Sequence, residues 1–158
     1  MTIIVNVSDA RVSVDPTDQI VTYSLGSCIG VAMYDPLVKC GGLLHYQLPT
    51  STLDADRARN NPCMFADTGV AHLLNQLAAC GAQKRRLKIK LAGGAQILDD
   101  SGVFSIGRRN HTAIRKVLWQ HGLMASGEDV GGSAPRTMSL CIADGAATIK
   151  SNGRTTNL

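Results

Sequence analysis

Cys28 and His45 are the residues whose types and spacing point to covalent chemistry. A cysteine acts as a nucleophile when a base takes its proton, a third group orients that base, and backbone N–H groups stabilise the oxyanion that forms. Cys28 lies in the stretch 21–31, which is rich in small residues, and His45 follows 17 residues later. This pair predicts a cysteine hydrolase in which His45 is the general base and acid.

Gly26, Ser27 and Thr22 supply the other parts of such a site. Because glycine tolerates backbone angles that strain other residues, we expect a sharp turn at Gly26. The small Ser27 leaves nearby N–H groups open, so the oxyanion hole is expected at the backbone of Gly26 and Ser27. Thr22 precedes the cysteine by six residues, and its hydroxyl is placed to fix the imidazole tautomer. A neighbouring imidazole favours the thiolate, which predicts a lowered pKa for Cys28.

The elements around this pair are expected to bring the two side chains together. Residues 29–34 and 41–48 are apolar runs typical of strands, and a short turn separates them. Two strands joined in this way form an antiparallel hairpin, which places Cys28 and His45 at the same end. The preceding apolar run, 19–23, predicts the strand that carries the threonine.

The remaining chain predicts more strands and two main helices. One helix starts at Asp67 and ends before Gly81, because its apolar residues recur at helical spacing. Asn110 is expected to cap the second helix, which ends before Gly122. The polar stretch 50–61 is expected to be a long loop beside the site. Further strands are expected at 3–7, 11–14, 86–91, 123–126, 137–142 and 146–150.

Length and composition bound the fold and the setting. With 158 residues, 44% of them apolar, the chain is expected to form one domain, 1–158, with a frayed polar tail at about 151–158. No apolar run of about 18 residues and no signal-peptide pattern occur, so we expect a cytoplasmic protein that is not embedded in a membrane. The net charge of +4 comes with only 4% aromatic residues and no nucleic-acid motif, which argues against nucleic-acid binding.

The cysteine and histidine pattern argues against a metal site and a disulfide framework. The five cysteines include no Cys-x-x-Cys pair and are odd in number, so all are expected to be reduced thiols. The cysteines other than the proposed nucleophile are interpreted as small buried hydrophobes, namely Cys40, Cys63, Cys80 and Cys141. The other histidines are interpreted as structural helix residues, namely His72, His111 and His121. We therefore expect no metal and no cofactor.

The segments 25–28 and 44–49, which hold Cys28 and His45, resemble the active-site pattern of the chemoreceptor glutamine deamidases, the CheD family of bacterial and archaeal chemotaxis. The likeness runs from about residue 3 to about residue 150, in the same order and at similar spacing. Further matching stretches are 65–68 (FADT), 91–95 (LAGGA), 106–107 (IG) with Arg109 and Asn110, and 128–132 (EDVGG).

This resemblance implies a reaction, a site and a fold. It implies hydrolysis of selected glutamine side-chain amides on methyl-accepting chemotaxis receptors to glutamates, without a cofactor. In such enzymes a cysteine is the nucleophile, a histidine the general base and acid, and a threonine completes the triad, which corresponds to Cys28, His45 and Thr22. The implied fold is a layered α+β domain of mixed sheets and helices, akin to certain toxin deamidases. The resemblance also implies a partner, a chemotaxis phosphatase of the CheC type.

Two surfaces are candidates for binding a receptor helix. One is the stretch 50–61, which leaves the histidine strand. The other is the segment 101–110, in which Phe104 offers an apolar contact and Arg108 and Arg109 offer charges suited to an acidic helix surface. Phe104 fits a core aromatic equally well.

Two other classes of function stay open on the residues alone. A non-catalytic adaptor would bind the receptor or the phosphatase, but the presence of both Cys28 and His45 speaks against it. A cysteine protease or transglutaminase would use the same nucleophile and base with a different leaving group or acyl acceptor. The sequence separates these enzymes only weakly from a deamidase.

Overall fold

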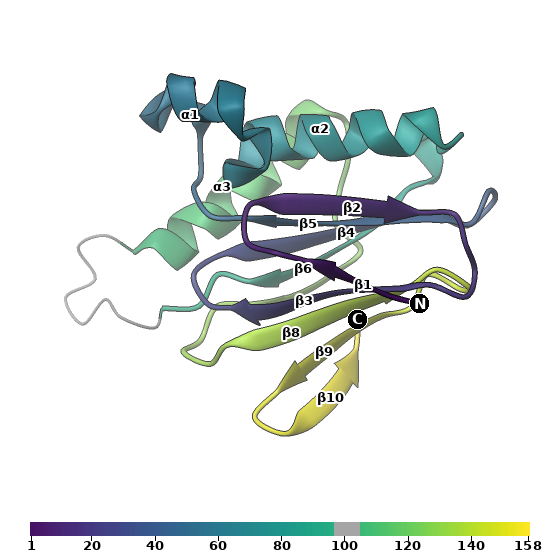
Figure 1. Ribbon diagram of the computed structural model, residues 1–158. Coiled ribbons are helices and arrows are strands. Elements are labelled where there is room, and N and C mark those ends of the chain that lie inside the picture. Colours follow the sequence, from purple (N-terminus) through teal and green to yellow (C-terminus); the bar gives the residue numbers. More distant parts are fainter. Residues whose placement is uncertain (97–104) are drawn as a thin grey trace.

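The computed structural model describes residues 1–96 and 105–158, which form three layers (Figure 1). The central sheet has the strand order β2 (Asp9–Ser13), β5 (Cys40–Tyr46), β4 (Ile29–Asp35), β6 (Lys88–Gly93) and β7 (Gly127–Val130). The outer sheet has the order β1 (Thr2–Val5), β3 (Gln19–Leu25), β8 (Arg136–Cys141), β9 (Ala147–Ser151) and β10 (Arg154–Asn157). Parallel and antiparallel pairs occur in both sheets, which confirms the predicted α+β class with mixed sheets.

Helices form the third layer, on the face of the central sheet that points away from the outer sheet (Figure 1). The two main helices are α2 (Ala66–Ala79) and α3 (Ile106–Gln120), and a short α1 (Ala55–Asn60) precedes them. Single 3₁₀ turns lie at Ser51–Leu53, Pro62–Met64 and Lys84–Arg86. In the described parts of the chain, no helix combines the length and the apolar character needed to cross a membrane.

The central strands β4 and β5 are buried along their whole length because both of their faces are covered. On the helix side, Val31 and Leu44 belong to an apolar core that includes Leu73. On the other side, Leu43 and Met138 belong to a second core between the two sheets. Side chains of β5 therefore alternate between the helix layer and the outer sheet.

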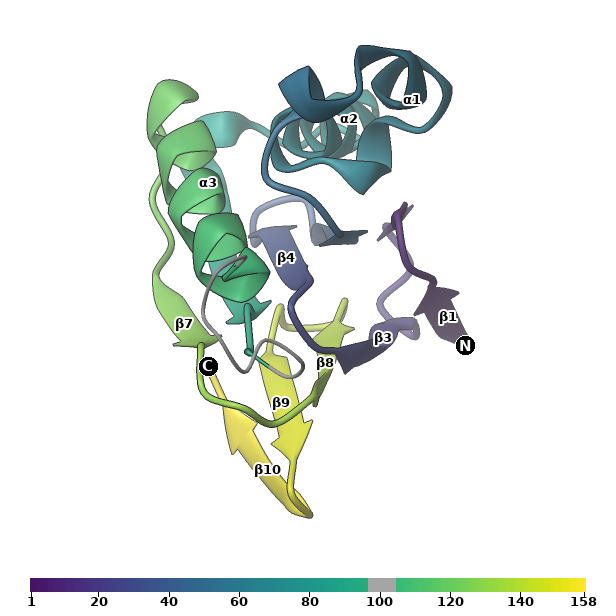
Figure 2. The ribbon, with the colours of Figure 1, turned by 90° about the vertical axis from the view of Figure 1, so that its left-hand side faces the viewer.

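The β4–β5 hairpin is confirmed, with Ile29 opposite Tyr46 and Asp35 opposite Cys40. The start of β4 and the end of β5 consequently lie at the same end of the molecule, which faces the viewer in Figure 2. Strand β3 ends and α3 begins at this end as well. Three layers thus converge on the region around Cys28.

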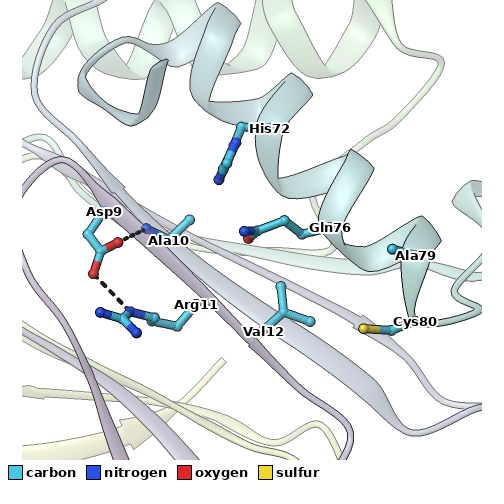
Figure 3. A pocket seen from close by; sticks show the side chains of 8 residues that line it. All are labelled: Asp9, Ala10, Arg11, Val12, His72, Gln76, Ala79 and Cys80. Carbon is cyan, nitrogen blue, oxygen red and sulfur yellow. Dashed lines mark hydrogen bonds and ion pairs between the residues drawn. The ribbon is translucent and has the colours of Figure 1, made fainter. Parts of the chain in front are cut away.

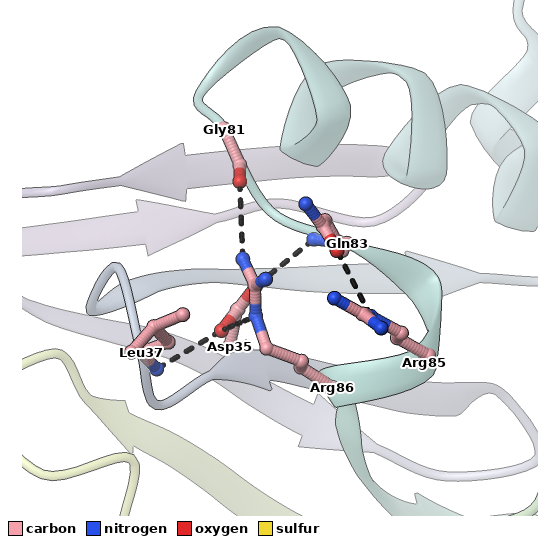
Figure 4. Close-up of polar contacts among 6 residues, drawn as sticks. All are labelled: Asp35, Leu37, Gly81, Gln83, Arg85 and Arg86. Atoms are coloured by element: carbon pink, nitrogen blue, oxygen red, sulfur yellow. Dashed lines mark hydrogen bonds and ion pairs between the residues drawn. The ribbon is translucent and has the colours of Figure 1, made fainter.

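The opposite end of the hairpin is held by a buried carboxylate (Figure 4). Asp35 has no exposed surface and forms an ion pair with Arg86 at 2.8 Å. Its oxygens also accept hydrogen bonds from the backbone N–H groups of Gln83 and Leu37. Burial alone would raise the pKa of Asp35, but these hydrogen bonds outweigh it and lower the pKa to about 2. The charged group therefore ties the hairpin to the connection between α2 and β6.

Two stretches differ from the prediction near the helices. The expected loop 50–61 contains α1, because the side chain of Asp54 accepts the N–H of Arg57 and caps a helical turn. The strand expected at 123–126 begins later in the chain, as β7 at Gly127–Val130. Leu123 and Ala125 pack against the helix-side core and are not part of a strand.

The tail is ordered, contrary to the expected fraying. Strand β10 pairs antiparallel with β9, with Arg154 opposite Ser151. The turn between them has positive φ at both central residues, 52° at Asn152 and 75° at Gly153. An Asn-Gly pair is the preferred sequence for such a two-residue hairpin turn, and it was the signal in the sequence for this strand.

Candidate active site

Thr22 and His45 meet between the two sheets. Thr22 projects from β3 of the outer sheet and His45 from β5 of the central sheet, and their exposed fractions are 0% and 1%. The Thr22 Oγ1 atom lies 2.7 Å from His45 Nδ1. The same hydroxyl donates its proton to the carbonyl of Val5 at 2.8 Å. Because that proton is used, the hydroxyl must accept from Nδ1–H, which fixes the tautomer of the imidazole.

This tautomer leaves His45 Nε2 as an unprotonated nitrogen. The atom is buried and has no hydrogen-bond partner among the described residues. Burial lowers the pKa of His45 from its ordinary 6.5 to about 4, and the uncharged Thr22 hydroxyl supplies no charge to oppose this. The imidazole is therefore neutral at pH 7 and able to accept a proton at Nε2.

Cys28 lies on the same face of the hairpin as His45. Gly30 pairs with His45 in the β4–β5 ladder, and Cys28 precedes Gly30 by two residues, which is a diagonal neighbour position. The Cys28 side chain packs against the core between the two sheets. Thr22 enters the same space from β3 of the outer sheet. A side chain at Gly30 would meet Met138 Sδ at 2.9 Å, so glycine allows the sheets to pack closely here.

The ionisation state of Cys28 differs from the prediction. Burial raises the pKa of the Cys28 thiol above its ordinary value, whereas the sequence predicted a lowered one. A neutral His45 offers no positive charge to stabilise a thiolate, which is the physical reason for the difference. The resting state therefore has a neutral thiol and a neutral imidazole on the same face of the hairpin, with no hydrogen bond between them.

The backbone before β4 is fixed from outside the hairpin. The three consecutive carbonyls of Gly26, Ser27 and Cys28 accept hydrogen bonds from Ala95 N–H (2.8 Å), Asn110 Nδ2 (2.9 Å) and Gly94 N–H (2.9 Å), respectively. Neither of the N–H groups of Ser27 and Cys28 donates to another described residue. Since a planar peptide directs its carbonyl and its N–H to opposite sides, these two N–H groups point away from the segments that hold the carbonyls.

The sharp turn lies at a different residue from the one expected. The left-handed backbone conformation is at Ser24, with φ 57°, and Gly26 has no positive φ. The register of β3 and β8 shifts between Thr22 and Leu25, so a bulge redirects the chain toward Cys28. The residue next to the site that must be glycine is Gly93. A Cβ at this position would lie 2.1 Å from the Cys28 carbonyl oxygen, which is too close for any side chain.

Asn110 is not a helix cap as the sequence predicted. Helix α3 begins at Ile106, and Asn110 lies inside it with an exposed fraction of 0%. Its side chain contacts the backbone of the nucleophile stretch. Asn110 lies four residues from both Ile106 and Ile114, on the apolar side of the helix, and this position was the sequence signal for a buried polar contact.

Comparison with known proteins shows the family of this chain. Residues 47–151 match the family described as CheD chemotactic sensory transduction. The chain is 49% identical to a probable chemoreceptor glutamine deamidase CheD of Solibacter usitatus, over 96% of this chain and 90% of the relative. The chain belongs to the CheD family. A probable chemoreceptor glutamine deamidase CheD 1 of Syntrophus aciditrophicus is 50% identical, over 96% of this chain and 94% of the relative.

A third CheD relative, from Anaeromyxobacter dehalogenans, is 44% identical over 93% of this chain and 92% of its own length. The similarity to CheD proteins therefore extends well before residue 47, where the family match begins, and includes the stretch that holds Cys28 and His45.

A groove in this CheD chain brings together parts of the two candidate substrate surfaces. Its volume is about 690 Å³, and it lies between the start of the stretch 50–61 and α3. Arg108 and Arg109 line it and are exposed, whereas Phe104 lies outside the described residues. The remaining lining residues are Pro49, Thr50, Thr52, Asp67, Thr112, Ala113, Lys116, Val117 and Gln120.

A separate hollow of about 550 Å³ lies between β2 and α2 (Figure 3). His72 and Cys80 line it, together with the Asp9 and Arg11 ion pair. Cys80 is exposed there, so its interpretation as a buried hydrophobe was wrong, while Cys40 and Cys63 are buried as predicted. None of the groups proposed for catalysis lines this hollow.

Proposed function

We propose that this chain hydrolyses glutamine side-chain amides of chemoreceptors to glutamates, with Cys28 as nucleophile, His45 as general base and acid, and Thr22 as the residue that orients His45. The observation that carries the proposal is the buried hydrogen bond of 2.7 Å between Thr22 and His45, which leaves Nε2 free on the face where Cys28 lies. The names of the CheD relatives supply the reaction and the class of substrate.

The first half of the reaction forms a thioester. The Cys28 sulfur bonds to the amide carbon while its proton passes to His45 Nε2, so a thiolate need not exist beforehand. The N–H groups of Ser27 and Cys28 hold the oxyanion, and Gly26 supplies the small residue beside them. When the tetrahedral intermediate collapses, the leaving nitrogen takes the proton from His45 and departs as ammonia.

The second half hydrolyses the thioester. Water attacks the thioester carbon and gives a proton to His45 Nε2, and the same N–H groups hold the second oxyanion. Collapse breaks the carbon–sulfur bond, and the departing Cys28 sulfur takes the proton back from His45. The product is a glutamate side chain, and the enzyme returns to its neutral resting pair.

Thr22→Val should lower kcat about 10- to 100-fold, because the imidazole loses the acceptor that fixes its tautomer. The variant should also be less stable by about 1–3 kcal/mol, since the Val5 carbonyl and His45 Nδ1–H are left unpaired in the core. Receptor deamidation kinetics and thermal unfolding measure the two effects. Thr22→Ser keeps the hydroxyl and should retain kcat; an unchanged kcat in Thr22→Val would remove Thr22 from the site.

The reaction itself is tested by mass spectrometry of a purified receptor signalling domain after incubation with the enzyme. A deamidase replaces an amide NH₂ by OH at particular glutamines and leaves the chain intact. Cleavage of the chain would indicate a protease, and a glutamine joined to an amine would indicate a transglutaminase. A receptor that is bound but chemically unchanged would support the adaptor alternative.

The groove beside α3 is proposed to hold the receptor helix around the target glutamine. Its basic side chains Arg108, Arg109 and Lys116 suit an acidic helix surface. Replacing both Arg108 and Arg109 by glutamate should raise the KM for intact receptor about tenfold, or about 1.4 kcal/mol, with a smaller change in kcat.

The matched control is the double variant Lys84→Glu with Arg85→Glu, which changes the net charge equally. Both of these residues are exposed and lie next to Arg86, which pairs with Asp35 at the far end of the hairpin. If the two double variants shift KM by the same amount, the effect is one of overall charge and the groove is not the binding surface.

The proposed reaction also leads to proposals for the cellular location, the domain organisation and a partner of this chain. Chemoreceptor signalling domains are the proposed substrate, so we propose a cytoplasmic location and a single deamidase domain spanning 1–158. A CheC-type phosphatase stays a predicted partner.

A further inference from the structure

Asn110 connects the two chain segments that carry the proposed nucleophile and base. Its Nδ2 donates to the carbonyl of Ser27 at 2.9 Å and to the carbonyl of Gln47 at 2.8 Å. Ser27 precedes Cys28, and Gln47 follows His45 by two residues. Carbonyl oxygens only accept hydrogen bonds, so both hydrogens of the NH₂ group are used and the orientation of the amide is fixed.

The bond to Ser27 acts on the peptide unit that contains the Cys28 N–H. The Ser27 carbonyl and the Cys28 N–H belong to one planar peptide and point in opposite directions. Asn110 draws the carbonyl toward α3, so the N–H is directed away from α3.

Asn110 is itself held in place by the base strand. The Tyr46 hydroxyl donates to the backbone carbonyl of Asn110 at 2.5 Å, and Tyr46 has no exposed surface. The approach of α3 is close, since a Cβ at Gly107 would lie 2.5 Å from the carbonyl oxygen of Ala95. The helix cannot slide away from the nucleophile stretch without breaking these contacts.

We propose that Asn110 is a positioning residue that aims the Cys28 N–H at the oxyanion of the tetrahedral intermediates. This inference rests on the proposed cysteine mechanism. Asn110 touches neither the substrate nor the reacting sulfur in this arrangement, and its effect is transmitted through the Ser27–Cys28 peptide. Without the amide, the Ser27 carbonyl loses its only described hydrogen-bond donor, and the direction of the Cys28 N–H is held only through the neighbouring peptides.

Asn110→Ala is expected to lower kcat for receptor deamidation about 100-fold, the usual loss for one oxyanion donor, with KM changed less than about threefold. Alkylation of Cys28 by iodoacetamide requires the thiolate and no oxyanion hole. Its rate and pH dependence should therefore stay within about threefold of the wild type. This separation of kcat from thiol reactivity is a result that a merely structural role would not produce.

Ile114→Ala is the matched control, because Ile114 is also 0% exposed on α3 and belongs to the helix-side core. It should lose stability and keep kcat within about twofold of the wild type. Asn110→Ser keeps one hydroxyl donor and should recover about tenfold in kcat relative to alanine. If the alanine variant does not fold, the serine variant is judged by the same criteria against the wild type.

Each outcome has a definite meaning. An undiminished kcat in the Asn110 variants, or a parallel loss of kcat and Cys28 alkylation, would overturn the positioning role. Absence of deamidation by the wild type, or retention of it by Cys28→Ala in the same assay, would overturn the proposed function instead. The two failures are thereby distinguished.

Discussion

Replacing Cys28 by alanine is expected to abolish receptor deamidation while the protein stays folded. The substitution removes the one atom that bonds to the substrate carbon, and removal of a nucleophile from such a site costs on the order of 10⁴-fold or more in kcat. The side chain is only partly buried at the edge of the core between the sheets, so little packing is lost. Receptor mass spectrometry and ammonia release measure the loss of activity, and thermal unfolding measures whether the variant stays folded.

The control for this variant is alanine at the exposed Cys80, which lies in the separate hollow between β2 and α2. Cys80→Ala should keep the activity of the wild type. A well-folded alanine variant at Cys40, Cys63, Cys80 or Cys141 that was as inactive as Cys28→Ala would refute a single nucleophile at Cys28.

His45→Gln is expected to lower kcat by about 10³- to 10⁴-fold, because the glutamine amide can bond to Thr22 but cannot accept and return a proton. Addition of a strong external base should not restore the rate, since Nε2 lies in a buried position. The variant should still bind receptor with a KM close to that of the wild type. Activity close to that of the wild type in this variant would exclude His45 as the base.

The same variant should change how stability depends on pH. The pKa of His45 is about 4 in the folded protein and 6.5 as an ordinary value, so between these values the unfolded chain binds the extra proton. Stability therefore falls as pH drops from 6.5 to 4, by up to about 3 kcal/mol from this group. His45→Gln lacks the titrating ring and does not lose this stability. The free energy of unfolding of the variant minus that of the wild type should therefore be larger at pH 4.5 than at pH 7, as measured by urea unfolding. A constant difference would contradict the lowered pKa.

The sequence was sufficient to predict the hairpin and both of its proposed catalytic residues. Cys28 and His45 flank two apolar runs with a short turn between them, and local periodicity alone dictates that such runs pair. The Thr22 contact required more, because Thr22 lies in the other sheet. Nothing in the local sequence determines how two sheets stack, so the position of Thr22 before the cysteine only suggested a contact with the imidazole, and the family resemblance supplied its place in the triad.

The buried role of Asn110 could not be predicted for a related reason. At a helix start asparagine is usually a cap, and local sequence favours that interpretation. The structure instead places it one turn inside α3, where its partners are 83 and 63 residues away in the chain. The lowered pKa expected for Cys28 was also wrong, since burial depends on the whole fold whereas the expectation considered only its nearest neighbour.

Because the residues of the site come from three layers, enzymatic activity depends on how these layers pack against one another. Thr22 belongs to the outer sheet, His45 to the central sheet, Cys28 to the segment directly before β4 of that sheet, and Asn110 to the helix layer. A compact state that kept every strand and helix but loosened the packing between layers would show native secondary structure. It would contain all four residues and no working site, because no single layer holds enough of them to perform the reaction.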